Sequence, residues 1–211
     1  MISALPGACP HEGSSGDSTA LASALRLAVS ALDGAGVPYL LIGGLASAIL
    51  GRPRCSSDVD LFVAPECAPR ALAALAGADF STEITNATWL YKAFSQDILV
   101  DILFRTVGDI YLDREMLRRS QLYQFLGTRV RVVAPEDLIV IKALVHDEET
   151  PRHWHDALAL LARHDLDWGY LLGRARHGPR RVLSLLLYAA SNDRLVPSRV
   201  LRQLADQLLE D

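Results

Sequence analysis

Two aspartates one residue apart, Asp58 and Asp60, open an apolar run and are the side chains of this 211-residue chain best placed to do chemistry. In a β-strand alternate residues point to the same face, so the two carboxylates would project side by side from one end of a strand. Carboxylates held this close repel each other unless a cation lies between them. Hard oxygen ligands of this kind suit Mg²⁺, so the pair predicts a site for a divalent cation.

A third carboxylate, Asp101, is the single charge in the apolar run ILVDILF at residues 98–104. Such a charge is costly unless it has a partner or lies at a solvated edge. Three carboxylates from two neighbouring strands can hold two divalent ions about 3.5–4 Å apart, as in-line phosphoryl chemistry requires. One Mg²⁺ would bind a triphosphate, and the other would activate a hydroxyl, with Asp101 as its ligand and a general base. The alternative is that Asp58 is a cap or turn residue and that Asp60 and Asp101 form ion pairs.

Upstream of the aspartates, Gly43 and Gly44 follow an apolar run and precede a short apolar segment. A glycine turn at the start of a helix offers backbone N–H groups to a phosphate, although an ordinary strand–turn–helix connection has the same pattern. In the loop GRPRCSS, Arg54 could bind a phosphate through two hydrogen bonds or simply lie on the surface. Together with the carboxylates, these residues suggest a site for a metal-bound nucleoside triphosphate.

The residues between 43 and 63 follow the pattern GGxAxxxxGxxRxSxDxDhhV, in which h is hydrophobic, and a later hDhh surrounds Asp101. This combination resembles the DNA-polymerase-β-type nucleotidyltransferase superfamily, and within it the small bacterial AbiEii/MenT-like proteins. The resemblance covers residues 37–176. It includes a helix with a lysine, Lys142 in APEDLIVIKAL, and a helix motif whose second aspartate is matched by Asp156 in PRHWHDALALL.

The resemblance implies Mg²⁺-dependent transfer of a nucleoside monophosphate from a nucleoside triphosphate to an acceptor hydroxyl. Asp58, Asp60 and Asp101 would hold two ions and carry catalysis. The nucleotide phosphates would be bound by residues of the glycine turn, the arginine loop and the lysine helix, with an aspartate orienting the lysine or an arginine: Gly43, Gly44, Arg54, Lys142 and Asp156. From the residues alone, Lys142 could equally extend to solvent and Asp156 could form a structural ion pair.

Two departures from the family pattern bear on the substrate rather than on the carboxylates. His153 stands where the first aspartate of the helix motif is common, and Leu45 follows a GG pair where many members have GS. The expected acceptor is tRNA or protein in a toxin–antitoxin-type setting, with a possible antitoxin partner. The basic segment 173–181 could contact an RNA backbone, or its arginines could balance helix ends.

Two other functions remain open. An aminoglycoside- or lincosamide-type nucleotidyltransferase would need an acidic acceptor pocket, which the segment HDEET at 146–150 could supply. A non-catalytic module that binds a nucleotide or a partner would keep the fold without turnover. Three clustered carboxylates argue against such a module, because a binding protein has little reason to hold them together.

Composition sets further limits. Half of the residues are hydrophobic, and the net charge of −4 argues against a general nucleic-acid coat. Three cysteines without a CxxC pair favour a reducing cytoplasm. No apolar run reaches ~18 residues and no signal pattern opens the chain, so we expect a cytoplasmic protein with no membrane association.

The pattern of elements predicts an α/β (α+β) nucleotidyltransferase fold, with a mixed sheet, flanking helices and a C-terminal helical bundle. Residues 1–17 are expected to be disordered, 18–134 to form the core and 135–211 to be helical, with breaks near 150–151, 178–179 and 196–197. Helices are predicted over residues 18–32, 45–50, 69–77 and 113–120. Strands are predicted over residues 37–42, 58–63, 88–94, 98–104, 122–125 and 129–133.

Overall fold

A computed structural model describes residues 15–193 and 196–209 of the chain. The predicted disordered segment lies largely outside these residues and stays a prediction for residues 1–14. The predicted disordered range ends too late, at residue 17, because helix α1 (Ser15–Gly34) already begins at Ser15. Its run of Leu and Ala residues favours a helix, and the helix ends where Gly34 and Gly36 allow the chain to turn.

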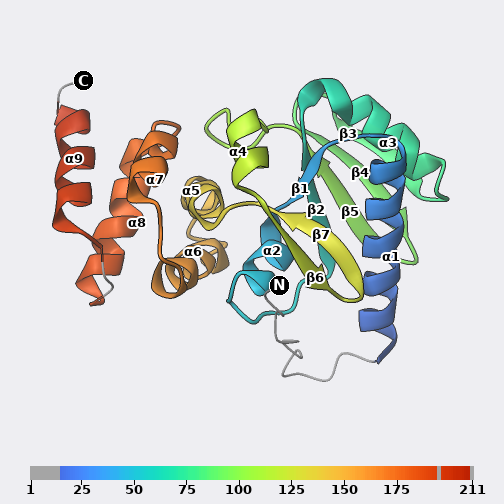
Figure 1. Cartoon of the computed structure of the whole chain (residues 1–211), viewed down its shortest axis with the longest axis horizontal. Helices are drawn as coiled ribbons and strands as arrows, with labels where there is room; N and C mark the ends of the chain where they lie inside the picture. The colour runs from blue at the N-terminus through green and yellow to red at the C-terminus, as the bar shows by residue number, and fades with distance from the viewer. Residues whose placement is uncertain (1–14, 194–195, 210–211) are drawn as a thin grey trace. The chain divides into compact units, whose positions relative to one another are not determined.

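The described chain divides into two compact units. The first ends at Ala134 and lacks only Leu50–Arg52 and Val107–Ile110, which belong to the second. In the described part of the chain, the first unit contains a seven-stranded sheet in the order β3-β4-β5-β2-β1-β7-β6 (Figure 1). The strands are β1 (Tyr39–Leu41), β2 (Asp58–Val63), β3 (Ser81–Asn86), β4 (Leu90–Ser95), β5 (Ile98–Leu103), β6 (Gln121–Phe125) and β7 (Thr128–Val132).

The sheet is mixed, as predicted. β2 runs antiparallel to β1 and parallel to β5, while β1 runs parallel to β7. The helices of this unit are α1, α2 (Gly43–Ile49), α3 (Ala68–Ala76) and α4 (Arg114–Arg119), with a short 3-10 turn at Pro65–Cys67. The mixed sheet with flanking helices confirms the predicted fold class.

Alternation along β5 shows how the two faces of the sheet differ. Val100 and Ile102 are fully buried, whereas Leu99, Asp101 and Leu103 between and beside them are half-buried. Helices α1 and α3 both contact β5, and Figure 1 shows them lying along one side of the sheet. The buried residues therefore face these helices, and the opposite face carries Asp101.

The two strands predicted over residues 122–125 and 129–133 pair with each other as the antiparallel β6–β7 hairpin. Its two connecting residues, Leu126 and Gly127, have φ values of 46° and 77°, which suit a tight turn between twisted strands. β3 was not predicted. All of its six residues are exposed, so no alternation of apolar and polar side chains marks the strand in the sequence.

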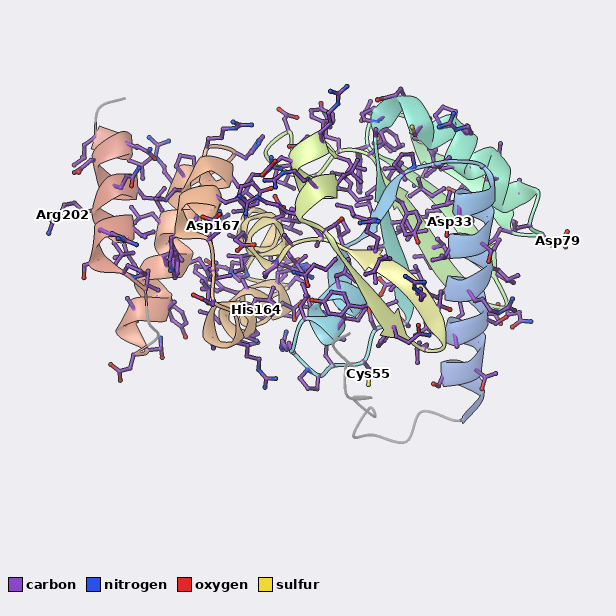
Figure 2. All side chains as sticks on the ribbon, viewed as in Figure 1. Asp33, Cys55, Asp79, His164, Asp167 and Arg202 are labelled. Carbon is purple, nitrogen blue, oxygen red and sulfur yellow. The ribbon has the colours of Figure 1, made fainter. Side chains whose placement is uncertain are left out.

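The second unit is built on helices, as predicted for residues 135–211. They are α5 (Pro135–Val145), α6 (Arg152–Arg163), α7 (Trp168–Ala175), α8 (Pro179–Ser191) and α9 (Ser198–Leu209). The structure adds one unpredicted break, between α6 and α7, and Figure 2 labels His164 and Asp167 in it. Asp167 caps α7 by accepting a hydrogen bond from the Tyr170 N–H at 3.0 Å.

Helix α5 is the centre of this unit and contacts α6, α7 and α8. Its first turn buries two acids. Asp137 accepts hydrogen bonds from Arg174 Nε at 2.8 Å and from the Tyr170 hydroxyl, and Glu136 Oε1 accepts one from the Asp167 N–H at 2.9 Å. Buried carboxylates are tolerated because these donors replace water. Among the described residues, no helix combines the length and apolar character needed to cross a membrane.

At the end of α5, the His146 ring packs edge-on against Trp154 with 4.3 Å between ring centroids. Burial lowers the pKa of His146, and Arg181 and His155 lower it further, while Asp147 and Glu148 raise it. The folded protein therefore favours the neutral imidazole.

Because the pKa of His146 is lowered in the folded protein, the free energy of unfolding should decrease as the pH falls. In the unfolded chain a histidine titrates near pH 6.5, so the stabilisation is fully present above that pH and is lost as the pH falls toward the lower folded pKa. We expect the unfolding free energy of His146→Gln to decline less between about pH 7.5 and 5.5 than that of the unaltered chain. Urea titrations at each pH measure this. Equal slopes for the two proteins would contradict the prediction.

Candidate active site

The three predicted carboxylates lie on two adjacent strands. Asp58 and Asp60 open β2, and Asp60 is the register partner of Asp101 on parallel strand β5. Side chains of register partners point to the same face, and alternate residues share a face, so all three carboxylates project from the face opposite α1 and α3. The structure therefore brings Asp58, Asp60 and Asp101 together as the sequence analysis expected.

Each carboxylate has a different local environment. Asp58 Oδ1 accepts a hydrogen bond from Ser56 Oγ at 2.7 Å, and Asp60 Oδ2 accepts one from the Gly44 N–H at 3.4 Å. Asp101 Oδ1 is buried and receives no hydrogen bond. Burial raises the pKa of Asp101; the nearby Lys92 lowers it and the Asp58 charge raises it. A buried carboxylate oxygen without a donor, close to another carboxylate, is a position that a cation would stabilise.

Whether these residues suit a divalent cation depends on their donors and on their present conformations. Within the described ranges, no three His, Cys, Asp or Glu side chains are gathered as the ligands of one ion. Asp58 and Asp60 instead accept the hydrogen bonds from Ser56 and Gly44. Three carboxylates on one face, one with an unsatisfied buried oxygen, nevertheless form the hard donor set that Mg²⁺ prefers. The types of donor therefore suit the ion, and in the free protein Asp58 and Asp60 bind Ser56 and Gly44 instead.

The glycine turn packs directly against the carboxylate strand. Gly43 has a φ of +69°, and a Cβ built on it would lie 1.7 Å from Asp60 Oδ2 and 2.8 Å from Asp60 Cβ. Because the Cβ of Asp60 is also too close, rotating its carboxylate would not make room for a side chain. At Gly44, a Cβ would lie 2.2 Å from Ser56 Oγ and 2.7 Å from Arg54 Nη2. Both glycines are needed for this close approach.

Arg54 is half-buried, and its guanidinium lies over the glycine turn, as the approach to Gly44 shows. Its Nε donates a hydrogen bond to the Cys55 carbonyl at 3.2 Å, which fixes the direction of the side chain. The first unit thus places the predicted glycines, arginine and carboxylates in one neighbourhood. Ser56 was not singled out from the sequence, although it is the serine of the RxSxDxD pattern.

Lys142 and Asp156 belong to the second unit. Asp156 is fully buried and accepts a hydrogen bond from Lys142 Nζ at 3.0 Å. It also pairs with the guanidinium of Arg52, whose Nη1 donates to the Arg152 carbonyl at 2.9 Å. Asp156 therefore holds both a lysine and an arginine. Sequence reasoning missed Arg52, and its place in the loop GRPRCSS was the available signal.

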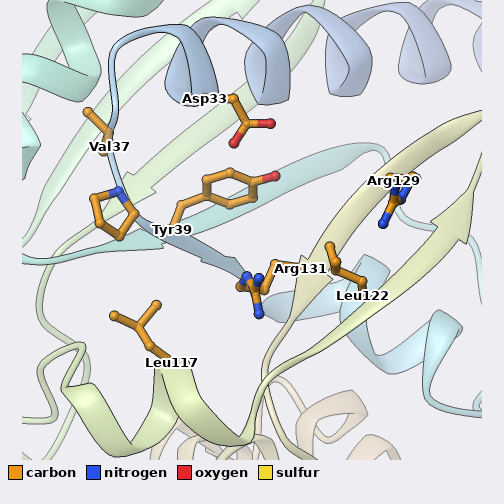
Figure 3. A pocket seen from close by; sticks show the side chains of 8 residues that line it. Asp33, Val37, Tyr39, Leu117, Leu122, Arg129 and Arg131 are labelled. Carbon is orange, nitrogen blue, oxygen red and sulfur yellow. The ribbon is translucent and has the colours of Figure 1, made fainter.

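A separate pocket of about 450 Å³ lies at the other end of β1, away from Gly43. Figure 3 shows residues of α1, β1, α4 and the β6–β7 hairpin around it: Asp33, Val37, Pro38, Tyr39, Leu117, Leu122, Arg129 and Arg131. Burial and the Asp33 charge raise the pKa of Tyr39 to about 12, although Arg131 opposes the shift. Tyr39 is therefore neutral at physiological pH, and none of the predicted site residues lines this pocket.

Replacing Gly43 tests the close packing of the turn on Asp60. Gly43→Ala should lose the ~1–2 kcal/mol that a left-handed backbone costs a residue with a side chain, plus the cost of displacing Asp60. Gly36→Ala is a matched control, because Gly36 has a φ of +62° and nothing within 4 Å of its added Cβ. Chemical denaturation measures both losses. Equal losses in the two variants would show that Asp60 adjusts without cost.

Removing one partner of the buried pair in the second unit should be strongly destabilising. Asp156→Asn takes the carboxylate away from the buried Lys142 ammonium, which costs ~3–5 kcal/mol, whereas Lys142→Met should cost less, because Arg52 still pairs with Asp156. The double variant should lose less than the sum of the two, as a double-mutant cycle by urea denaturation would measure. Glu115→Gln, which breaks an exposed pair with Arg118, should change stability little. Additive losses in the double variant would mean that the two side chains act independently.

Comparison with solved structures places the chain among nucleotidyltransferase folds. The antibiotic-resistance factor ANT(2'')-Ia is 17% identical, with 83% of this chain and 94% of that chain covered and a TM-score of 0.52. The lincosamide antibiotic adenylyltransferase LnuA, solved with lincomycin bound, is 13% identical, with coverages of 67% and 97% and a TM-score of 0.50. MenT4, a nucleotidyltransferase toxin of Mycobacterium tuberculosis H37Rv, is 15% identical with coverages of 86% and 68%, and its TM-score of 0.44 supports no inference.

Sequence comparison identifies the family directly. No curated protein matches the chain. A family model described as "Nucleotidyl transferase of unknown function (DUF2204)" matches residues 21–163, which is more than half of the chain and includes all three carboxylates and the Lys142–Asp156 pair. The chain therefore belongs to this nucleotidyltransferase family and is a nucleotidyltransferase.

Proposed function

We propose that this nucleotidyltransferase transfers a nucleoside monophosphate from a nucleoside triphosphate to an acceptor hydroxyl in a Mg²⁺-dependent reaction. The observation that carries the proposal is the placement of Asp101, with its unsatisfied buried oxygen, beside Asp60 and on the same sheet face as Asp58. The glycine turn and Arg54 adjoin the same strand and supply groups that bind phosphate.

In this proposal the three carboxylates have different roles in metal binding and proton transfer. Asp58 and Asp60 would hold two Mg²⁺ ions, and Asp101 would be a further ligand of the ion on the acceptor side. When bound, these ions supply positive charge to the triphosphate and favour ionisation of the acceptor hydroxyl. Asp101 would also accept the proton of the acceptor hydroxyl.

The phosphates are bound by uncharged and cationic groups of the chain. The Gly43–Gly44 turn offers backbone N–H groups, and Arg54 stabilises negative charge that develops on the phosphates. From the resemblance of its helix to the AbiEii/MenT-like branch, Lys142 would also bind phosphate as a point charge. In the reaction, the acceptor oxygen forms a bond to the α-phosphorus while the bond from that phosphorus to the bridging oxygen breaks. The bonding electrons leave with pyrophosphate.

For the acceptor, we propose tRNA or protein in a toxin–antitoxin-type setting, with an antitoxin as possible partner. This rests on the resemblance of the motifs to the AbiEii/MenT-like branch. A small-molecule acceptor is the second candidate. It is favoured by the fold shared with ANT(2'')-Ia and with LnuA, because this chain covers 94% and 97% of their lengths. A structure of ANT(2'')-Ia contains adenylyl-2''-tobramycin.

Transfer of label tests the reaction and the acceptor together. The protein is incubated with each α-labelled nucleoside triphosphate and Mg²⁺, with total tRNA, with the protein alone, or with a panel of aminoglycosides and lincosamides. We expect label on tRNA or protein, and none with Asp58→Asn/Asp60→Asn, because the ions would lose two ligands. Label on an antibiotic alone would establish the second candidate. Equal transfer by the double variant, or absence of both transfer and nucleotide binding in the unaltered protein, would refute the proposal.

A further inference from the structure

Lysine is much rarer than arginine in this chain. Only two of its 21 Lys and Arg residues are lysines, Lys92 and Lys142. Lys142 pairs with the buried Asp156, and Lys92 on β4 is the register partner of Asp101 on β5. Lysine differs from arginine in carrying a compact charge on a flexible four-carbon stem, so it can move between neighbouring partners.

Lys92 stands in a row of charges that crosses four strands. Glu83 on β3 is the register partner of Lys92 on β4, Lys92 is the partner of Asp101 on β5, and Asp101 is the partner of Asp60 on β2. Register partners share a face and neighbouring strands lie ~4.8 Å apart, so the four side chains extend from adjacent positions on one face of the sheet. Lys92 therefore has a carboxylate on each side.

The two carboxylates beside Lys92 differ in their surroundings. Glu83 is exposed and accepts a hydrogen bond from Thr85 Oγ1 at 3.2 Å, whereas Asp101 is half-buried and its Oδ1 receives no hydrogen bond. When no other cation is present, the Lys92 ammonium is attracted more strongly to the partly desolvated Asp101 than to the exposed Glu83. A second cation at Asp101 would repel the ammonium, and Glu83 then offers it a solvated partner on the far side.

We propose that Lys92 is a positioning residue that acts as a tethered cation at Asp101 and turns to Glu83 when a divalent ion is bound there. The proposal rests on the function proposed above. Lys92 neutralises Asp101 before the acceptor-side ion arrives and so weakens binding of that ion. Glu83 has the opposite effect, because it stabilises the position to which the ammonium withdraws.

Direct binding of Mn²⁺ to the full-length protein without nucleotide, followed by electron paramagnetic resonance, tests the proposal. Lys92→Met should bind Mn²⁺ roughly tenfold more tightly, which corresponds to ~1.4 kcal/mol. Glu83→Gln should bind it more weakly, and the Lys92→Met/Glu83→Gln double variant should behave as Lys92→Met alone. Arg70→Met is the control, because it removes the same charge from an exposed position on α3, which packs on the other face of the sheet. Thermal melts check that each variant is folded.

The outcomes separate this proposal from the function on which it rests. Asp101→Asn should weaken Mn²⁺ binding, which would locate the ion at the carboxylates. With that result in hand, unchanged or weaker binding by Lys92→Met would overturn the role of Lys92, and unchanged binding by Glu83→Gln would overturn the movement toward Glu83. If the unaltered protein binds no Mn²⁺, or binds it equally well without Asp101, the proposed metal site fails and the role of Lys92 fails with it.

Discussion

Mutual repulsion between carboxylates is the constraint around which the first unit is arranged. Asp58, Asp60 and Asp101 share one face of the sheet, and charges this close destabilise one another unless each is compensated. Neighbouring groups compensate them individually: Ser56 donates to Asp58, and the Gly44 N–H donates to Asp60. Asp101, which has an oxygen without any donor, has the charge of Lys92 nearby. The loop, the turn and the neighbouring strand therefore each supply a group that compensates one of these carboxylates.

Close packing around the carboxylates also explains the two glycines of the turn, Gly43 and Gly44. The strand that carries Asp60 lies against the turn after β1 so closely that no side chain fits at Gly43, and Ser56 and Arg54 leave no room for one at Gly44. Backbone amides can approach a charged group closely only where side chains are absent. One pair of glycines therefore serves packing in the free protein and would serve recognition of phosphate in the proposed reaction.

Features that depend on local pattern were predictable from the sequence. The strand 58–63 was predicted with the bounds that the structure shows, because its apolar and acidic residues alternate and its ends are marked. β3 was not, since six exposed residues give no alternation. The partnership of Arg52 with Asp156 joins positions 104 residues apart, and the row from Glu83 to Asp60 depends on strand register. Neither can be read from spacing along the chain, because both arise only from tertiary pairing.

The two units are not contiguous in sequence, which affects how the gene could be divided between them. Leu50–Arg52 and Val107–Ile110 belong to the second unit, although the residues on either side of each segment belong to the first. The Arg52 that pairs with Asp156 is therefore encoded within the part of the gene that specifies the sheet. No single cut in the gene separates the units cleanly. A single recombination point between the codons of Arg52 and Asp156 would take the two members of this ion pair from different parents.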